Sequence, residues 1–68
     1  GVYPNPTQGI VIINSIVPVS VDVYDSNGRK IITGQTDNRL DLSSFANGTY
    51  IAVIYANNRI YKQTIIKS

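Results

Sequence analysis

The fold is decided by residues 19–33, which read VSVDVYDSNGRKIIT. Valines at 19, 21 and 23 alternate with Ser, Asp and Tyr at 20, 22 and 24, and this period of two predicts a strand with one buried face. Asn27-Gly28 separates that strand from the apolar run at residues 30–33. An Asn-Gly pair between two β runs is a strong hairpin signal, because both central residues of a type I′ turn need a positive φ.

The length of this hairpin loop has two solutions. A two-residue loop would pair Val23 with Ile32 and Val21 with Gly34. A four-residue loop over residues 25–28 is the alternative. Either loop makes the two apolar runs antiparallel neighbours.

The rest of the 68-residue chain has the same β character. Ile, Val, Thr and Tyr dominate, Glu is absent, and leucine occurs only at Leu40 and Leu42. β-branched residues favour a pleated surface, and turn signals recur at the spacing typical of all-β domains. We therefore expect one all-β domain over residues 2–68, a small antiparallel β-sandwich of six to seven short strands, immunoglobulin-like or fibronectin-III-like. Gly1 can be an expression scar outside that domain.

Proline, glycine and asparagine divide the remaining chain into elements. Pro4 and Pro6 make residues 4–9 a rigid bend, because proline fixes φ and donates no hydrogen bond. We expect strands at residues 2–3, 9–13, 39–42, 49–55 and 60–66, a loop at 34–38 and a turn at 57–58. Residues 43–48 should form a single helical or 3₁₀ turn that Gly48 closes with a positive φ. Residues 42–50 also resemble a tyrosine corner, in which the Tyr50 hydroxyl bonds to main chain just upstream.

The last two strands predict a hairpin with two different faces. Alternation leaves both faces partly apolar, and an exposed apolar strip marks either an interaction surface or a place that cargo or another strand covers. One face should carry Tyr50, Ala52 and Ile54 opposite Ile65, Gln63 and Tyr61, and the other Ile51, Val53 and Tyr55 opposite Thr64, Lys62 and Ile60.

The residues exclude most catalytic and metal chemistry. With no His and no Cys, the usual nucleophile–base pairs cannot be built. The four aspartates fall in strands and turns, and Asp25-Ser26-Asn27-Gly28 is only a fragment of a calcium loop that a hairpin turn also explains. We therefore expect no enzyme activity, no cofactor and no metal. A net charge of +2 without a basic aromatic stripe does not indicate nucleic acid.

Four blocks in order resemble the C-terminal sorting domain of the type IX (Por) secretion system, type A. The resemblance covers residues 2–68, and its motif positions include Pro4, Asn5, Pro6, Gly9, Asp25, Gly28, Asp41, Gly48 and Tyr50. The blocks are Tyr3-Pro4-Asn5-Pro6 with Gly9, residues 21–25 with Gly28-Arg29-Lys30, residues 40–45 with Gly48-Thr49-Tyr50, and Lys62 with Ile65-Ile66-Lys67. Phe45, Asn47 and Val53 depart from the usual pattern.

This resemblance implies a non-catalytic export signal. A separately folded N-terminal passenger would precede it, and the protein would cross the periplasm of a Bacteroidetes-type bacterium to the cell surface or the medium. The partners it implies are the outer-membrane translocon and a sortase-like cysteine peptidase, which can remove the domain and attach the passenger to anionic lipopolysaccharide.

Two surfaces are candidates for recognition by the translocon. The closing strand, residues 59–68, should lie at a sheet edge where a partner can add a strand, with Lys62 and Lys67 limiting self-association and Ile65 and Ile66 supplying β-branched bulk. The second surface is the sheet face that carries Val53 and Tyr55. An open edge and an apolar strip would also make the isolated domain prone to dimerise.

Two other functions compete with export. A fibronectin-like spacer would have further residues after Ser68, whereas a sorting signal would end there. A carbohydrate- or surface-binding module of a secreted enzyme would gather aromatic side chains on one platform, and the five tyrosines are instead spread along the chain.

Overall fold

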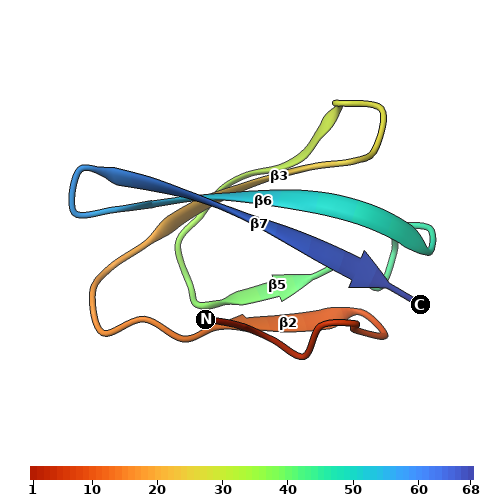
Figure 1. Ribbon diagram of the computed structural model, residues 1–68, viewed down its shortest axis with the longest axis horizontal. Coiled ribbons are helices and arrows are strands. Elements are labelled where there is room, and N and C mark those ends of the chain that lie inside the picture. Colours follow the sequence, from red (N-terminus) through yellow and green to blue (C-terminus); the bar gives the residue numbers. More distant parts are fainter.

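Two antiparallel sheets stack on each other in the computed structural model, which describes residues 1–68 (Figure 1). One sheet has three strands in the order β1-β2-β5, and the other has four in the order β4-β3-β6-β7. The all-β sandwich expected from the sequence is confirmed, and no helix able to cross a membrane is present. The strands are β1 (Val2–Tyr3), β2 (Ile10–Ile13), β3 (Ser20–Tyr24), β4 (Lys30–Gln35), β5 (Arg39–Asp41), β6 (Gly48–Ala56) and β7 (Arg59–Lys67).

The core fills the space between the two sheets. Strand alternation supplies it: Val21 and Val23 are fully buried in β3, as the period of two predicted. From the facing sheet, Val11 of β2 and Leu40 of β5 are also fully buried. The whole buried cluster comprises Val11, Ile13, Val19, Val21, Val23, Leu40, Leu42, Tyr50, Ala52, Ile54 and Ile65.

The β3–β4 turn follows the four-residue alternative and is not a type I′ turn. The Gly28 N–H donates to the Asp25 carbonyl at 3.0 Å, and of the two central residues of the expected turn only Gly28 has a positive φ, 80°. Val23 pairs with Ile32 as predicted, but Val21 pairs with Gln35 because β4 contains a bulge. The loop expected at 34–38 is therefore wrong in its first two residues, which belong to β4.

The β6–β7 hairpin has the predicted register throughout. Tyr50 lies opposite Ile65 and Val53 opposite Lys62, and each strand extends one residue beyond its expected ends. The turn residues Asn57 and Asn58 have φ values of 50° and 62°. The type I′ geometry expected at residues 27–28 thus occurs in this hairpin instead.

Residues 42–47 connect β5 to β6 by a turn without a helix. The Phe45 N–H donates to the Leu42 carbonyl at 3.0 Å, and Gly48 has the expected positive φ, 155°, where it begins β6. The Tyr50 hydroxyl donates to the Ala46 carbonyl, which confirms the tyrosine corner.

Candidate recognition surface

The Pro4–Thr7 segment, here called the N-terminal clamp, lies along the free edge of β7. The Asn5 side-chain amide donates from Nδ2 to the Thr64 carbonyl at 2.7 Å, and its Oδ1 accepts from the Ile66 N–H at 2.9 Å. A primary amide offers a donor and an acceptor, as a peptide group does. The Asn5 side chain therefore takes the place of a main-chain group of one more strand.

Thr7 extends this pairing to the end of the chain. Its N–H donates to the Ile66 carbonyl at 2.8 Å, and its carbonyl accepts from the Ser68 N–H at 2.9 Å. The pairing is parallel, and Thr7 is only 2% exposed. Its hydroxyl is also engaged, as donor to the Ile10 carbonyl and acceptor from the Gly9 N–H.

The clamp changes the prediction for the closing strand. Strand β7 is an edge strand, as expected, but its outward groups from the Thr64 carbonyl to the Ser68 N–H are already bound to Asn5 and Thr7. The prediction of an open edge along all of residues 59–68 is therefore wrong. The unoccupied part of the edge is the half that contains Lys62.

Two of the predicted recognition residues point inward. Ile65 is fully buried opposite Tyr50, and Lys67 is 9% exposed with its ammonium 2.6 Å from the Phe45 carbonyl and 3.5 Å from the Ser43 carbonyl. Odd-numbered residues of β7 face the other sheet, so both side chains serve the fold. Lys67 is not the solvated edge charge that the sequence predicted.

The other predicted residues lie on the outer face, the side of the four-stranded sheet that points away from the three-stranded sheet. Ile66 is 45% exposed, Tyr55 is 39% exposed, and Lys62 is exposed between them. Val53 is only 9% exposed and lies between its cross-strand neighbours Asp22 and Lys62. The outer face thus holds a partly exposed apolar row of Tyr55, Ile60 and Ile66, in which Lys62 and Thr64 lie between Ile60 and Ile66. A shallow groove continues from Tyr55 and Ile60 into Ile51 and Tyr24.

The acidic side chains hold turns and bulges together. Asp22 accepts the Gly34 N–H at 2.8 Å in the β4 bulge and lies 3.5 Å from the Lys30 ammonium. The charge of Asp22, followed by that of Tyr24, raises the pKa of Lys30. The Lys30 ammonium also lies over the Tyr24 ring at 5.6 Å.

The motif residues Asp25 and Asp41 have the same role in their turns. Asp25 accepts N–H groups of Asn27 and Arg29, and hydrogen bonding from the Arg29 backbone is the main cause that lowers its pKa. Hydrogen bonding from the side chain and then the backbone of Ser43 lowers the pKa of Asp41. No group of three acidic side chains able to hold a metal ion is present.

Gly9 is required by a close approach of two loops. A Cβ at this position would lie 2.7 Å from Ser43 Oγ and 3.3 Å from Ser43 Cα, and the Gly9 carbonyl accepts the Leu42 N–H at 2.7 Å. Any side chain would push the clamp away from the turn after β5. The motif positions at 5, 9, 25 and 41 therefore share one function, which is to fix loops.

All residues of the chain, 1–68, match one protein family, described as the secretion system C-terminal sorting domain. The chain is a type IX C-terminal sorting domain. No curated protein matches it. Family membership gives the sorting domain its general function, as a signal for export of a passenger to the cell surface or the medium by the type IX machinery.

Sequence reasoning missed two functional details of this sorting domain. Thr7 and Asp22 are buried polar residues: the main chain of Thr7 pairs with the distant β7, and Asp22 bonds to the bulge of the neighbouring β4. No local pattern marks either residue. Asn5 carried a usable signal. Both neighbours of Asn5 are prolines, which have no N–H to pair with an edge, so Asn5 supplies every hydrogen-bond donor of that short stretch, through its main-chain N–H and its side-chain amide.

Proposed function

We propose that this sorting domain is read by the type IX translocon through its outer face, which directs the preceding passenger from the periplasm across the outer membrane. The observation that carries the proposal is the apolar row of Tyr55, Ile60 and Ile66, exposed by 39%, 63% and 45%. These side chains come from the two longest strands, so they form a rigid surface. Lys62 lies in the same row and adds a positive charge.

The chemistry of this surface suits docking rather than catalysis. Apolar side chains next to a cation favour a partner that buries hydrophobic area and offers an acceptor, as at the centre of many protein interfaces. Three of the four aspartates, Asp22, Asp25 and Asp41, accept backbone N–H groups, and neither His nor Cys is available for acid–base or nucleophilic steps.

An export assay with matched variants tests the outer face. The parent protein carries Ile60→Asp on that face, or Ile16→Asp on the loop between β2 and β3, where the side chain is fully exposed at 102%. We expect Ile60→Asp to leave the passenger in the periplasm and Ile16→Asp to export normally. Unfolding temperatures of both proteins should stay close to that of the unsubstituted protein, because neither side chain is buried.

Two outcomes of this export assay would refute the proposal. Normal export of Ile60→Asp would exclude the outer face, and equal loss with Ile16→Asp would indicate a general effect of added charge. Point variants are preferable to truncation of residues 65–68, because truncation removes the buried Ile65 and the Lys67 contacts with the turn after β5.

Removal of the domain after transit forms the second half of the proposal. A sortase-like cysteine peptidase would cleave upstream of β1 and join the passenger to anionic lipopolysaccharide. The exposure of Gly1 and Tyr3 supports this view, because the start of the domain lies at the surface. Intact-mass analysis of the exported passenger tests it: a product that lacks residues 1–68 is expected, and an exported product that retains them would refute removal.

A further inference from the structure

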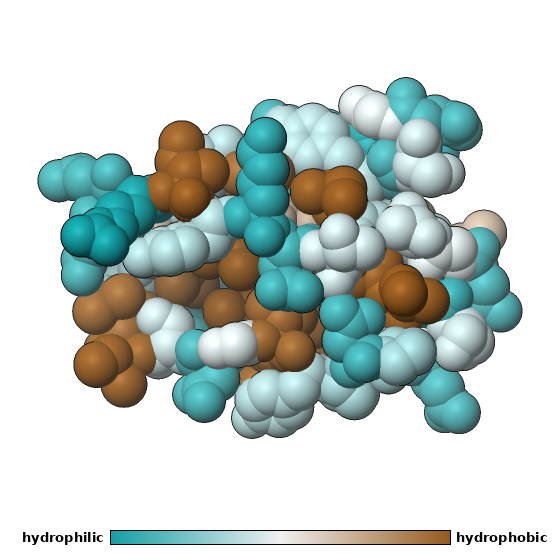
Figure 2. Space-filling view, viewed as in Figure 1, coloured by the Kyte–Doolittle hydropathy of each residue, from teal (hydrophilic) through white to brown (hydrophobic).

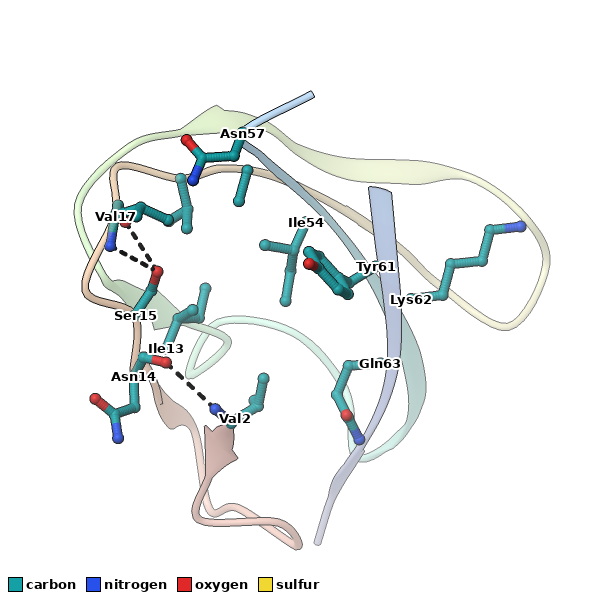
Figure 3. A pocket seen from close by; sticks show the side chains of 13 residues that line it. Val2, Ile13, Asn14, Ser15, Val17, Ile54, Asn57, Tyr61, Lys62 and Gln63 are labelled. Carbon is teal, nitrogen blue, oxygen red and sulfur yellow. Dashed lines mark hydrogen bonds between the residues drawn. The ribbon is translucent and has the colours of Figure 1, made fainter. Parts of the chain in front are cut away.

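The two sheets do not close on each other along the side where β1 and β2 face β7. Strand β1 has two residues and β7 has nine, so the first half of β7 has little opposite it. Between them lies a cavity of about 380 Å³, here called the interlayer cleft. Val2 and Ile13 line it from one sheet and Ile54 and Tyr61 from the other; Figure 3 shows the Tyr61 ring pointing into the space.

The interlayer cleft is apolar at its base and open at its mouth. Ile13 and Ile54 are buried at 4% and 8% exposure, whereas Tyr61 is 50% exposed and Gln63 is also exposed. In the space-filling view, hydrophobic side chains are visible between the two layers (Figure 2). An additional layer of side chains could therefore be buried here without moving the core.

The mouth of the interlayer cleft is bordered by unpaired main-chain groups of β7. The outward-facing groups are those of even-numbered residues, as the bonds of Thr64 and Ile66 to the clamp show. The same alternation turns the main-chain groups of Ile60 and Lys62 outward, and no hydrogen bond reaches them from outside the sheet. An edge strand with free groups is a template for pairing with another strand.

The charges at this edge select the kind of strand that fits. Arg59 and Lys62 form no ion pair, because the two ion pairs of the domain are made by Arg29 and Lys30. No Asp or Glu follows Asp41 in the sequence. A second copy of β7, paired antiparallel about Lys62, would place like charges opposite each other, which is unfavourable.

We propose that the interlayer cleft and the free half of the β7 edge together accept a strand donated by a partner in the export machinery. About five residues would pair with Arg59–Gln63, the part of β7 that precedes the clamp. Alternate side chains would be apolar and enter the interlayer cleft beside Tyr61, and those between them would be acidic and lie next to Lys62, which points away from the cleft (Figure 3). The partner identity rests on the proposed export function. The site uses the main-chain edge of β7 and the side chains that face the interlayer cleft, whereas the outer face uses the exposed side chains of Tyr55, Ile60 and Ile66; Lys62 borders both.

Proline at position 62 tests the main-chain part of this proposal. The Lys62 N–H points outward, so Lys62→Pro removes a donor for the added strand and leaves the β6–β7 ladder intact. Lys62→Ala is the matched control, because it removes the same side chain and keeps the N–H. We expect export of the full parent protein to fall roughly tenfold further with proline than with alanine.

A second variant tests the cleft without touching the backbone. Gln63→Trp places a large ring at the mouth of the interlayer cleft, where Gln63 is exposed and no buried contact is lost. Export should fall while the unfolding temperature stays the same or rises. If Lys62→Pro and Gln63→Trp are both exported normally, the proposal is refuted, whatever the unfolding temperature of either variant.

Charge reversal and sedimentation identify the occupant. Lys62→Glu should reduce export more than Lys62→Gln, and equal export of the two would refute an acidic strand. If the parent protein sediments as a dimer and Lys62→Pro dissociates it, the strand in the interlayer cleft comes from a second copy. That result would refute a partner in the export machinery. If Ile60→Asp blocks export while Lys62→Pro and Gln63→Trp do not, the inference fails and the outer-face function stands.

Discussion

Removing the Asn5 amide should weaken the sandwich by an amount that can be worked out from its two bonds. Asn5→Ala deletes the bonds to the Thr64 carbonyl and from the Ile66 N–H, of 2.7 and 2.9 Å. Each neutral hydrogen bond contributes about 0.5–1.5 kcal/mol net. Because both are exposed, water can replace part of this, so we expect a loss of about 1–2 kcal/mol.

That loss is large for a domain of this size. Marginal stability of about 0.05–0.15 kcal/mol per residue implies roughly 3–10 kcal/mol for the whole domain. In small domains, about 1 kcal/mol shifts the unfolding temperature by roughly 4–8 °C. Urea unfolding and calorimetry of the sorting domain should therefore resolve the Asn5→Ala effect clearly.

The nearly isosteric change Asn5→Asp distinguishes the two hydrogen bonds, because a carboxyl can donate a hydrogen bond only when it is protonated. Asn5→Asp keeps the acceptor for Ile66, but at neutral pH its carboxylate opposes the Thr64 carbonyl and raises the variant's carboxyl pKa in the folded state. A carboxyl whose pKa is raised in the folded state adds stability that is fully present at pH values below its unfolded pKa, about 3.9. This contribution is lost as the pH rises through the folded pKa. Because the protonated carboxyl can donate to Thr64, the stability gap to the unsubstituted domain should narrow below about pH 4.

Amide exchange provides the local readout. The Ile66 N–H is bonded only to the Asn5 side chain and should lose protection in Asn5→Ala, whereas the Ile65 N–H lies within the β6–β7 ladder and should change only with global stability. Unchanged Ile66 protection, or a pH-independent gap for Asn5→Asp, would refute the view that this amide substitutes for a strand.

Three further predictions concern the corner, the strand faces and titration. Tyr50→Phe should lower the free energy of unfolding by about 1 kcal/mol in urea titrations, since it deletes only a hydroxyl bonded to main chain; an unchanged midpoint would contradict this. Ile65→Ala should cost about 2–5 kcal/mol and Ile66→Ala less than about 1, and equal losses would overturn the assigned faces. Because Asp25 and Asp41 have lowered pKa values, the stability they add is present above about pH 4 and is lost as pH falls through their folded pKa values. Replacing both with Asn should reduce the loss of unfolding free energy at acid pH. If the dependence of stability on pH keeps its shape, the two aspartates are not its source.

The faces and register of the β6–β7 hairpin were predictable because a period of two leaves one consistent solution. Once Tyr50 faces the core, Ile65 opposite it must do so as well, and Val53 and Lys62 must share the other side. The same alternation, extended by one residue to the end of β7, puts Lys67 on the inner side with Ile65. The prediction of recognition residues on β7 rests on their β-branched and basic character, which does not distinguish the two faces, and it is wrong for the buried Ile65 and Lys67.

The bulge in β4 and the N-terminal clamp could not be predicted from local pattern. Ile31 and Ile32 are adjacent in sequence, yet both pack against the core, which requires an irregular strand. The clamp joins Asn5 to Thr64 and Ile66, which lie 59 and 61 positions later in the sequence. Such long-range pairing depends on which edge the folded sheets leave free, and the sequence does not display this.

The parallel pairing of Thr7 with the end of β7 has a mechanical consequence. A pull on the passenger draws the N-terminal segment one way along the strand axis, while a grip on Ser68 draws β7 the opposite way. The bonds of Asn5 and Thr7 would then be loaded together in shear, instead of opening one after another as in a peeled hairpin. Single-molecule stretching between the two ends should show one high rupture force that Asn5→Ala lowers, and a low, gradual extension in the unsubstituted domain would exclude a tension-bearing latch.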